Sequence, residues 1–437
     1  MRANPGQQNL GCPQAYKFPR FWIRGVILGT IVLILGGWTA SCRTDKSSVY
    51  LIGALYPLTG KAARYGEDSR AAAEMAAEKI NSNGGIHGRK LRLIFRDEEA
   101  NAERARELAR EFILRDRVDF LMGVVSSSAG LAVSDLSLSY KKIFIGTDHG
   151  SSRLTYENFQ KYYFRVNNNT YQATAAGALY AKEQPWRRYY TIGPDYEYGH
   201  IIWEDFKWLM KKHGVKMQVD GEAWPKLFEP DYTSYITAIK TAKPDVLFCS
   251  LWGGDMVTFL KQAAGMGLFD EVTLFSPDTG GNYEVFEALG DAIPEGLVLG
   301  AKHHNNWPET QANKEYVTEF KKRTGRFPTY AAEGAYVGVK FIAQALEIQP
   351  DTKDVDALVK VMETMKIPCP EDPEGFTSYM DPLTHQIVQM HAIGITRRNT
   401  SFPPATRMLA NWKVFDAELL VPTPEEVRER RKARGMK

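Results

Sequence analysis

The chain has 437 residues, 44% of them apolar, which is enough to bury a core in each of two domains. Its 55 basic and 52 acidic side chains leave a formal charge of only +3, and the body of the chain contains no basic run interleaved with aromatic residues. Composition therefore gives no support to nucleic-acid binding.

The N-terminus has the pattern of an export signal rather than of a folded element. Three basic residues between positions 17 and 24 precede an apolar run over residues 25–38, shorter than the roughly 20 residues that span a bilayer. Small residues then lead to Cys42, in a pattern similar to a bacterial lipoprotein processing site, so we predict that Cys42 is the lipidated first residue of the mature chain. The alternative is an uncleaved membrane anchor over residues 21–40. Both alternatives place the remainder in the periplasm or at the outer face of the cytoplasmic membrane, held to the membrane.

Residues 49–97 predict a strand, a loop, a long helix and a second strand. The run 49–55 is almost continuously apolar, as expected of a strand buried on both faces of a parallel sheet. The Ala-rich stretch 67–81 has helical spacing and is followed by an Asn-Gly-Gly turn and a strand at 90–95. The loop 56–66 follows the carboxyl end of the first strand, where ligands bind in open α/β sheets.

The same alternation of strands and helices continues along the chain and occurs in two series. In the first series we predict a helix at 102–115, a strand at 119–125, a helix from 129 and a strand at 142–147. In the second we predict strands at 188–192, 218–223, 245–250 and 273–276, with helices at 198–213, 232–242 and 256–265. A strand at 297–303, helices at 310–324, 331–346 and 355–365, and extended segments at 385–396 and 412–415 follow. Two similar α/β units that face each other across a cleft are the simplest architecture.

Residues 425–437 alternate Glu with Arg and Lys, and this predicts a solvated helix or a frayed end. The four cysteines do not form a disulfide framework; Cys249 in an apolar strand is expected to be buried, and its pairing with Cys369 stays open. The sequence has no nucleophile elbow, phosphate loop, dinucleotide fingerprint or metal-ligand spacing among its histidines. We therefore predict a protein that is not an enzyme and uses no metal or cofactor.

Several short motifs are distributed along this pattern. They are Gly-Ala-Leu-Tyr-Pro-Leu-Thr-Gly at 53–60, Tyr-Gly at 65–66, Gly-Gly-Ile-His-Gly-Arg at 84–89, Ser-Ser-Ser at 126–128, Tyr-Gly at 198–199, Pro-Asp at 277–278 and Pro-Glu-Gly-Leu at 294–297. With these motifs the chain resembles, over residues 48–396, the type I periplasmic solute-binding proteins of branched-chain amino acid (Leu/Ile/Val) ABC transporters.

The resemblance implies two doubly wound parallel-sheet lobes joined by three crossovers, near 167–170, 301–304 and 377–385. The implied domains are lobe I at 48–167 plus 303–378, lobe II at 168–302 plus 379–415, and a charged tail at 416–437. It also implies a small-molecule ligand captured by hinge closure and delivered to the permease subunits of an importer. The alternative is a ligand-sensing receptor protein that feeds a signalling partner.

The resemblance also places polar ligand-binding residues. Ser127, with Ser128 beside it, matches the hydroxyl that binds the ligand, and it precedes a helix whose free N–H groups favour a carboxylate. Helix capping alone is the other interpretation of these serines. Asp278 matches the acid that pairs with the ligand's ammonium in amino-acid-binding relatives, with turn capping through 279–281 as the alternative.

Aromatic and loop positions complete the predicted site. Tyr198 and Trp252 from the second lobe and Tyr65 from the first match aromatic cleft positions, although each is also compatible with ordinary core packing. Gly150 is expected to offer a backbone N–H. Asp148 departs from the family pattern, because a carboxylate there repels a ligand carboxylate unless it points away or the ligand carries an extra donor or cation. The expected ligand is a small carboxylate-bearing molecule, an amino acid or an aromatic compound.

Overall fold

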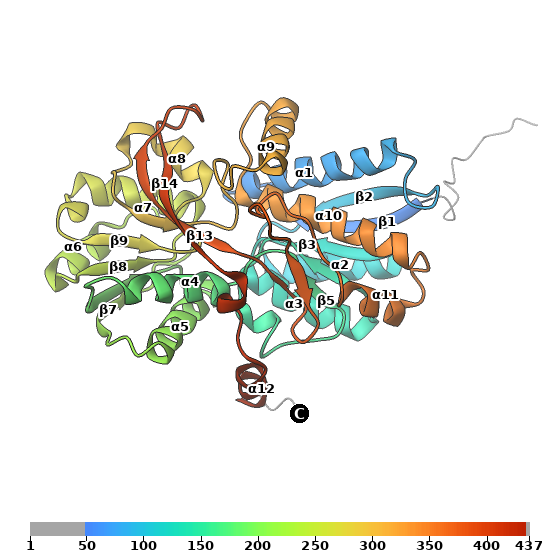
Figure 1. The fold of residues 1–437 in the computed structure, drawn as a ribbon, viewed down its shortest axis with the longest axis horizontal. Helices are drawn as coiled ribbons and strands as arrows, with labels where there is room; N and C mark the ends of the chain where they lie inside the picture. Colours follow the sequence, from blue (N-terminus) through green and yellow to red (C-terminus); the bar gives the residue numbers. More distant parts are fainter. Residues whose placement is uncertain (1–48, 434–437) are drawn as a thin grey trace, which may run out of the picture. The chain divides into compact units, whose positions relative to one another are not determined.

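The computed structural model describes residues 49–433, and these contain two sheets of seven strands each (Figure 1). The predicted leader with Cys42, the alternative anchor and the last four residues of the tail lie outside the described residues. Within the described range, no helix has the length and apolar character needed to cross a membrane.

The first sheet has the strand order β11-β12-β5-β4-β3-β1-β2. Its strands are β1 (Val49–Tyr56), β2 (Lys90–Asp97), β3 (Phe120–Gly123), β4 (Phe144–Gly146), β5 (Tyr163–Arg165), β11 (Tyr379–Asp381) and β12 (Gln386–Val388). All neighbours pair in parallel except β11 with β12. We call this sheet and the helices that cover it the first lobe.

Alternation along the buried strands sends side chains into a core on each face of the first sheet. Ile52 and Ala54 of β1 join the core under α1 (Ala63–Ser82) and α10 (Tyr330–Ile348), which pack against each other. Leu55 joins the opposite core under α2 (Ala102–Glu111) and α3 (Ser127–Tyr140). Helix α11 (Val355–Met362) packs against α10.

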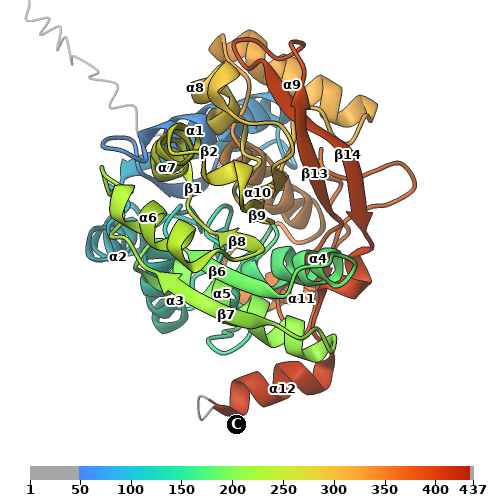
Figure 2. The same cartoon turned by 90° about the vertical axis from the view of Figure 1, so that its left-hand side faces the viewer.

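The second sheet has the strand order β14-β13-β10-β9-β8-β6-β7. Its strands are β6 (Arg188–Ile192), β7 (Gln218–Ala223), β8 (Val246–Cys249), β9 (Thr273–Ser276), β10 (Val298–Gly300), β13 (His391–Arg398) and β14 (Arg407–Phe415). Strands β6 to β10 pair in parallel, whereas β13 and β14 form the antiparallel edge that is visible as the long hairpin in Figure 2. We call this sheet and its helices the second lobe.

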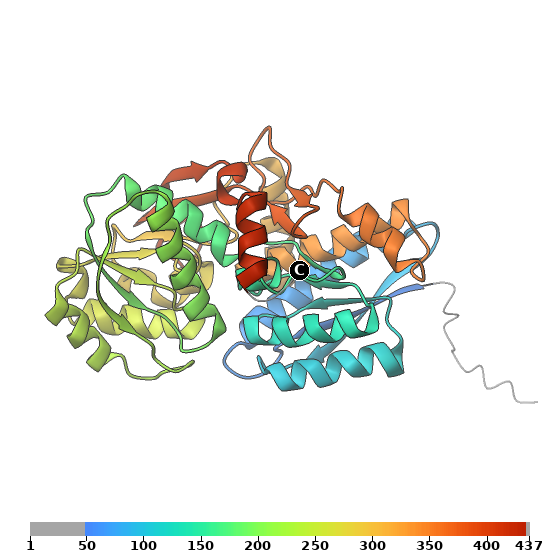
Figure 3. The ribbon, with the colours of Figure 1, turned by 90° about the horizontal axis from the view of Figure 1, so that it is seen from below.

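The second sheet is also covered on both faces. Helices α4 (Thr170–Lys182) and α5 (Glu197–Lys212) share one core with Phe248 of β8. Leu247 of the same strand lies in the other core, with α6 (Thr233–Ala242), α7 (Gly253–Gly265) and α8 (Tyr283–Leu289). Helix α9 (Gln311–Thr324) packs against α1, and α12 (Pro424–Ala433) follows the last strand (Figure 3). Two helix-flanked lobes with mainly parallel sheets confirm the predicted fold class.

The chain passes between the sheets three times, after β5, after β10 and after β12. The third passage is later than predicted. Strands β11 and β12 pair with β5, so residues 379–388 belong to the first sheet and not to lobe II, and the crossover falls at 389–390 instead of 377–385. These three-residue strands are too short to show a period in the sequence.

The tail is the second difference from the sequence prediction. It forms α12, but this helix is not simply solvated, because Val427 is fully buried and the Arg430 side chain is only 16% exposed. Arg430 forms ion pairs with Glu157 and Asp205, which lie more than 200 positions earlier in the chain. The alternation of charges within residues 425–437 does not indicate ion pairs with residues so distant in the sequence.

Candidate ligand-binding site

A pocket with about 270 Å³ of empty space lies between the two lobes, at the carboxyl ends of their parallel strands. Its walls are Val125, Ser127, Asp148, Gly150 and Tyr330 from the first lobe, and Tyr196, Tyr198, Trp252, Thr279 and Lys302 from the second lobe and the second crossover. Each except Tyr330 follows the end of a strand, as the general rule for open α/β sheets predicts.

The structure brings five predicted site residues into the pocket wall: Ser127, Asp148, Gly150, Tyr198 and Trp252. The other three lie close by. Asp278 contacts Tyr198, Tyr65 contacts Trp252, and Ser128 lies half-buried in the first turn of α3.

Ser127 connects the start of α3 to the loop after β4. Its Oγ accepts a hydrogen bond from the Ser151 N–H at 3.1 Å, while the N-cap residue Ser126 makes no side-chain capping bond. The N–H groups of the first helical turn have no acceptors within the helix. This end of α3 therefore offers hydrogen-bond donors of the kind that bind an anion.

Asp148 does not point away from the pocket. Its side chain is buried, and within the part of the chain that the structure describes neither carboxylate oxygen has a hydrogen-bond partner within 3.5 Å. Burial raises the pKa of Asp148 to about 7, although the nearby Lys302 ammonium opposes the shift and the Tyr330 hydroxyl also lies close enough to lower the pKa of this carboxyl. Asp148 is thus poised between charged and neutral forms near neutral pH.

Lys302 is the functional candidate that the sequence predictions missed. Its buried Nζ donates to the backbone oxygen of Asp148 at 2.7 Å, and it lies 5.6 Å from the centre of the Tyr330 ring. Burial lowers the pKa of Lys302, against the raising effect of the Asp278 and Asp148 charges. The signal available in the sequence was a lysine directly after an apolar strand, at a predicted crossover.

Asp278 is connected to the pocket by a hydrogen bond with Tyr198, which lies in the pocket wall. The Tyr198 hydroxyl donates to one Asp278 oxygen at 2.7 Å, and the other oxygen has no partner among residues 49–433. The predicted alternative of turn capping is not seen, because the carboxylate of Asp278 accepts from Tyr198 and from no N–H of residues 279–281. One carboxylate oxygen of Asp278 is therefore buried without a hydrogen-bond partner next to Tyr198, while Asp278 itself is not part of the pocket wall.

Tyr65 joins the two lobes beside the pocket. Its hydroxyl donates to Glu284 of α8, and its ring packs edge-on against Trp252 at 5.6 Å and beside Tyr330 at 5.5 Å. Burial raises the pKa of Glu284 to about 7, with the Tyr65 hydrogen bond opposing the shift. Tyr65 is thus a contact between the lobes beside the pocket, rather than a residue of its wall.

The sequence left the pairing of Cys249 with Cys369 open. Cys249 and Cys369 are both buried and both free thiols, so the structure contains no bridge between them. Among the described residues, no group of three or more His, Cys, Asp and Glu side chains is arranged to hold a metal ion.

Comparison with known proteins matches this architecture. The sequence model of a family described as "Periplasmic binding protein" matches residues 50–397. The leucine-, isoleucine-, valine-, threonine- and alanine-binding protein of Pseudomonas aeruginosa is 25% identical over 346 residues, which cover 78% of this chain and 88% of that protein. The Leu/Ile/Val-binding protein homolog 7 of Brucella suis is 27% identical over 337 residues, 74% of this chain and 81% of that protein.

A solved structure is similar over most of both chains. It is the solute-binding protein of an ABC transporter from Rhodopseudomonas palustris BisB5 in complex with 3,4-dihydroxybenzoic acid, with a TM-score of 0.77 and 26% identity. The match covers 86% of this chain and 99% of that one.

Proposed function

The chain belongs to the periplasmic binding protein family, and on this basis we propose that it is the substrate-binding component of an ABC importer that encloses a small solute between its lobes. The family consists of binding proteins, so the chain is a binding protein and not an enzyme. Membership also implies an exported, periplasmic protein. Solute binding shifts the lobes toward the closed state, and transporter subunits in the membrane respond to that state.

The ligand we propose is a small carboxylate-bearing molecule that also carries hydrogen-bond donors. The observation that supports it is the buried Lys302 ammonium lying beside two acids, Asp148 and Asp278, that have three unpartnered oxygens between them. Lys302 and the start of α3 favour a carboxylate, and the unpartnered oxygens favour N–H or O–H groups. Amino acids and hydroxylated aromatic acids both satisfy this pattern.

The relatives named above fit the same ligand chemistry. The Pseudomonas protein is named for amino acids, and the Rhodopseudomonas structure contains 3,4-dihydroxybenzoic acid. Plain leucine supplies an ammonium but no second donor group for Asp148. We therefore rank hydroxylated aromatic acids and amino acids with polar side chains above leucine.

A screen with matched compounds tests this proposal. Melting temperatures are measured with amino acids, 3,4-dihydroxybenzoate, benzoate and the corresponding carboxamides. A ligand at 100 times its Kd stabilises the folded state by about 2.7 kcal/mol, which is readily seen in such a screen. We expect 3,4-dihydroxybenzoate or a polar amino acid to raise the melting temperature, benzoate to do so less, and carboxamides not at all. If no carboxylate-bearing compound has an effect, the proposed ligand chemistry is wrong.

We also propose that Cys42 carries a lipid, or that the N-terminal segment stays uncleaved, so that the protein is held at the membrane. Acyl chains contribute about 0.8 kcal/mol per buried methylene group, and two of them give stable attachment. Mass spectrometry of the membrane fraction distinguishes the two forms. A chain that begins at a modified Cys42 supports lipidation, whereas an intact Met1 contradicts cleavage.

A further inference from the structure

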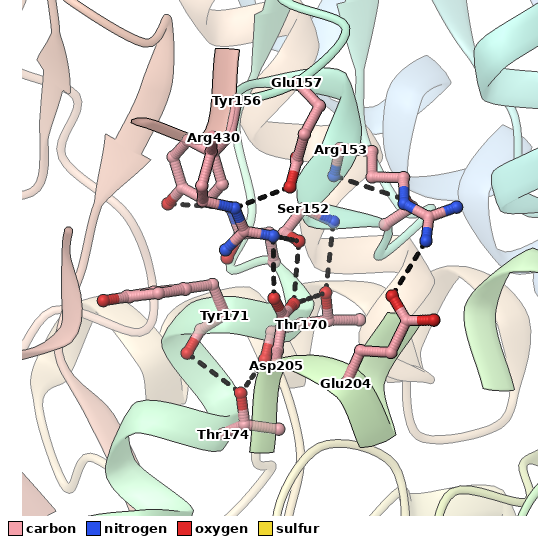
Figure 4. A network of polar contacts seen from close by, with 12 residues as sticks. Ser152, Arg153, Tyr156, Glu157, Thr170, Tyr171, Thr174, Glu204, Asp205 and Arg430 are labelled. Atoms are coloured by element: carbon pink, nitrogen blue, oxygen red, sulfur yellow. Dashed lines mark hydrogen bonds and ion pairs between the residues drawn. The ribbon is translucent and has the colours of Figure 1, made fainter. Parts of the chain in front are cut away.

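Arg430 of α12 is buried in a polar network that includes residues of both lobes (Figure 4). Its guanidinium pairs with Glu157 at 2.7 Å and with Asp205 at 2.9 Å, and it donates to the Ser152 hydroxyl at 3.2 Å. Ser152 and Glu157 lie between β4 and β5 of the first lobe, while Asp205 lies on α5 of the second. One side chain therefore joins the lobes.

Aromatic rings from the two lobes flank the same guanidinium. Its carbon lies 5.0 Å from the centre of the Tyr156 ring and 5.5 Å from that of Tyr171, which belong to the first lobe and to α4 of the second. Contact with two rings, combined with hydrogen bonds from two guanidinium nitrogens, suits Arg better than Lys.

Asp205 connects this network to the pocket. Its second oxygen accepts from the Ser152 and Thr170 hydroxyls, each at 2.7 Å (Figure 4). Thr170 in turn donates its N–H to the Gly150 carbonyl at 2.8 Å, and its hydroxyl accepts from the Ser152 N–H at 3.1 Å. The loop of residues 148–152, which supplies Asp148 and Gly150 to the pocket wall, is thus fixed at its far end by Asp205 and Arg430.

The rest of α12 is attached to both lobes as well. Glu426 pairs with Lys212 of α5 in the second lobe at 2.8 Å. Arg431 donates to the Leu383 carbonyl at 2.7 Å, between β11 and β12 of the first lobe. Residues 424–433 lie beyond the part of the chain that the family model matches, which ends at residue 397.

We propose that α12 is part of the binding machinery and that Arg430 is a positioning residue, which acts through Asp205 and Ser152 to hold loop 148–152 and the two lobes in the closed arrangement. The expected effect of Arg430 on solute affinity rests on the proposed function. The expected effect of Arg430 on loop 148–152 is independent of that function, because it is measured without any solute.

The first test is hydrogen exchange of the full chain without solute. In Arg430→Ala, the amides of Ser151, Ser152 and Thr170 are expected to exchange about tenfold faster, because each of their hydrogen bonds has its donor or its acceptor in the loosened loop 148–152. The control is Arg428→Ala, which removes the same charge from an exposed position on the same helix. Arg430→Gln, which keeps most of the side-chain length, replaces Arg430→Ala if that variant is too unstable to measure.

Chemical rescue separates positioning from general destabilisation. A groove lined by Glu157, Asp205 and Trp208 reaches Arg430 from solvent, so methylguanidinium is expected to refill the space left in Arg430→Ala and slow the exchange again. Methylammonium, which lacks a planar group with N–H donors on several nitrogens, is expected to have no such effect. Faster exchange confined to α12, with the Ser151 and Thr170 amides unchanged, would overturn the proposal, as would equal rescue by both cations.

The second test uses 3,4-dihydroxybenzoate as the probe. Its Kd is expected to rise about tenfold in Arg430→Ala, within the ~5–150-fold range usual for coupled sites, with most of the change in the dissociation rate. Arg428→Ala is expected to leave the Kd unchanged. A loop that exchanges faster while the Kd is unaltered would overturn the link to affinity, and a wild-type chain that does not bind the probe counts against the proposed ligand alone.

Discussion

Lys302 is the residue whose removal most directly tests the ligand chemistry. Lys302→Met removes a buried cation that faces the pocket, and hydrogen bonds to charged groups contribute about 1.5–3 kcal/mol. We expect carboxylate ligands to bind this variant roughly 30-fold more weakly than the wild-type chain. Calorimetric titration measures this, with Lys216→Met at an exposed position as the control. An unchanged Kd in Lys302→Met would remove Lys302 from carboxylate recognition.

Asp148 gives the protein a pH dependence with a defined sign. Its pKa is about 7 in the folded state, against about 4 for an ordinary aspartate, so folding takes up a proton between these values. Stability from this group is therefore greatest below about pH 4 and falls as the pH rises to about 7, where the charged form dominates. Glu284, also near 7, and the buried Glu98, near 8, act in the same direction.

Asp148→Asn is expected to remove part of this dependence. The variant should melt at a higher temperature than the wild-type chain at pH 8, and the difference should shrink toward pH 5, where the wild-type carboxyl is mostly neutral. Melting curves of the solute-free protein across this range measure the effect. A difference that is the same at both pH values would show that Asp148 is not the titrating group.

At the scale of the element, the start of α7 depends on one glycine. Gly253 has φ +54°, and a Cβ built there would lie 2.9 Å from the Tyr65 hydroxyl. Gly253→Ala is therefore expected to destabilise the fold by about 1–2 kcal/mol and to push Tyr65 from its contact with Glu284. Gly254→Ala is the matched control, because a Cβ at Gly254 meets no atom within 4 Å and alanine favours a helix. Similar urea midpoints for the two variants would contradict this.

Strands of four or more residues and long amphipathic helices were the elements that sequence could predict. The observed bounds of β6, β7 and β9 are those expected, and α1, α5 and α10 were found with ends shifted by a few residues. The predicted helix 102–115 changes to a π-helical turn at Phe112–Asp116, which helical periodicity does not distinguish. Helices α4 and α8 were not predicted, since α4 begins in the polar crossover and α8 is short.

The site residues that could be predicted from the sequence are those that follow the carboxyl ends of strands. Ser127, Asp148, Tyr198 and Trp252 all lie in the loops or first helical turns that follow strands, and these strand ends meet at one edge of each sheet. The position of Tyr330 in the wall was not foreseeable in this way, because it enters from the start of a helix that packs across the first sheet. The contacts of Arg430 depend on the assembled lobes and leave no trace in local sequence.

At the scale of the whole molecule, the contact of Tyr65 with Glu284 is expected to bias the protein toward closure. Tyr65→Phe removes this hydrogen bond between the lobes, which contributes about 0.5–1.5 kcal/mol, and leaves Glu284 without its donor. We expect the closed fraction of the solute-free protein to fall about fivefold, as measured by the radius of gyration in X-ray scattering. Tyr140→Phe on the surface of α3 is the control. An unchanged radius would show that this contact does not hold the lobes.

The position of Arg430 near the end of the chain also determines when the protein can finish folding. Asp205 precedes it by 225 residues, so at a synthesis rate of about 5–20 residues per second roughly 10–45 s separate the appearance of the two side chains. Both lobes have all their strands only after residue 415, and until Arg430 follows, the Asp205 carboxylate has only the hydroxyls of Ser152 and Thr170 as partners. The lobes of a nascent chain are thus less firmly joined until its last helix is added.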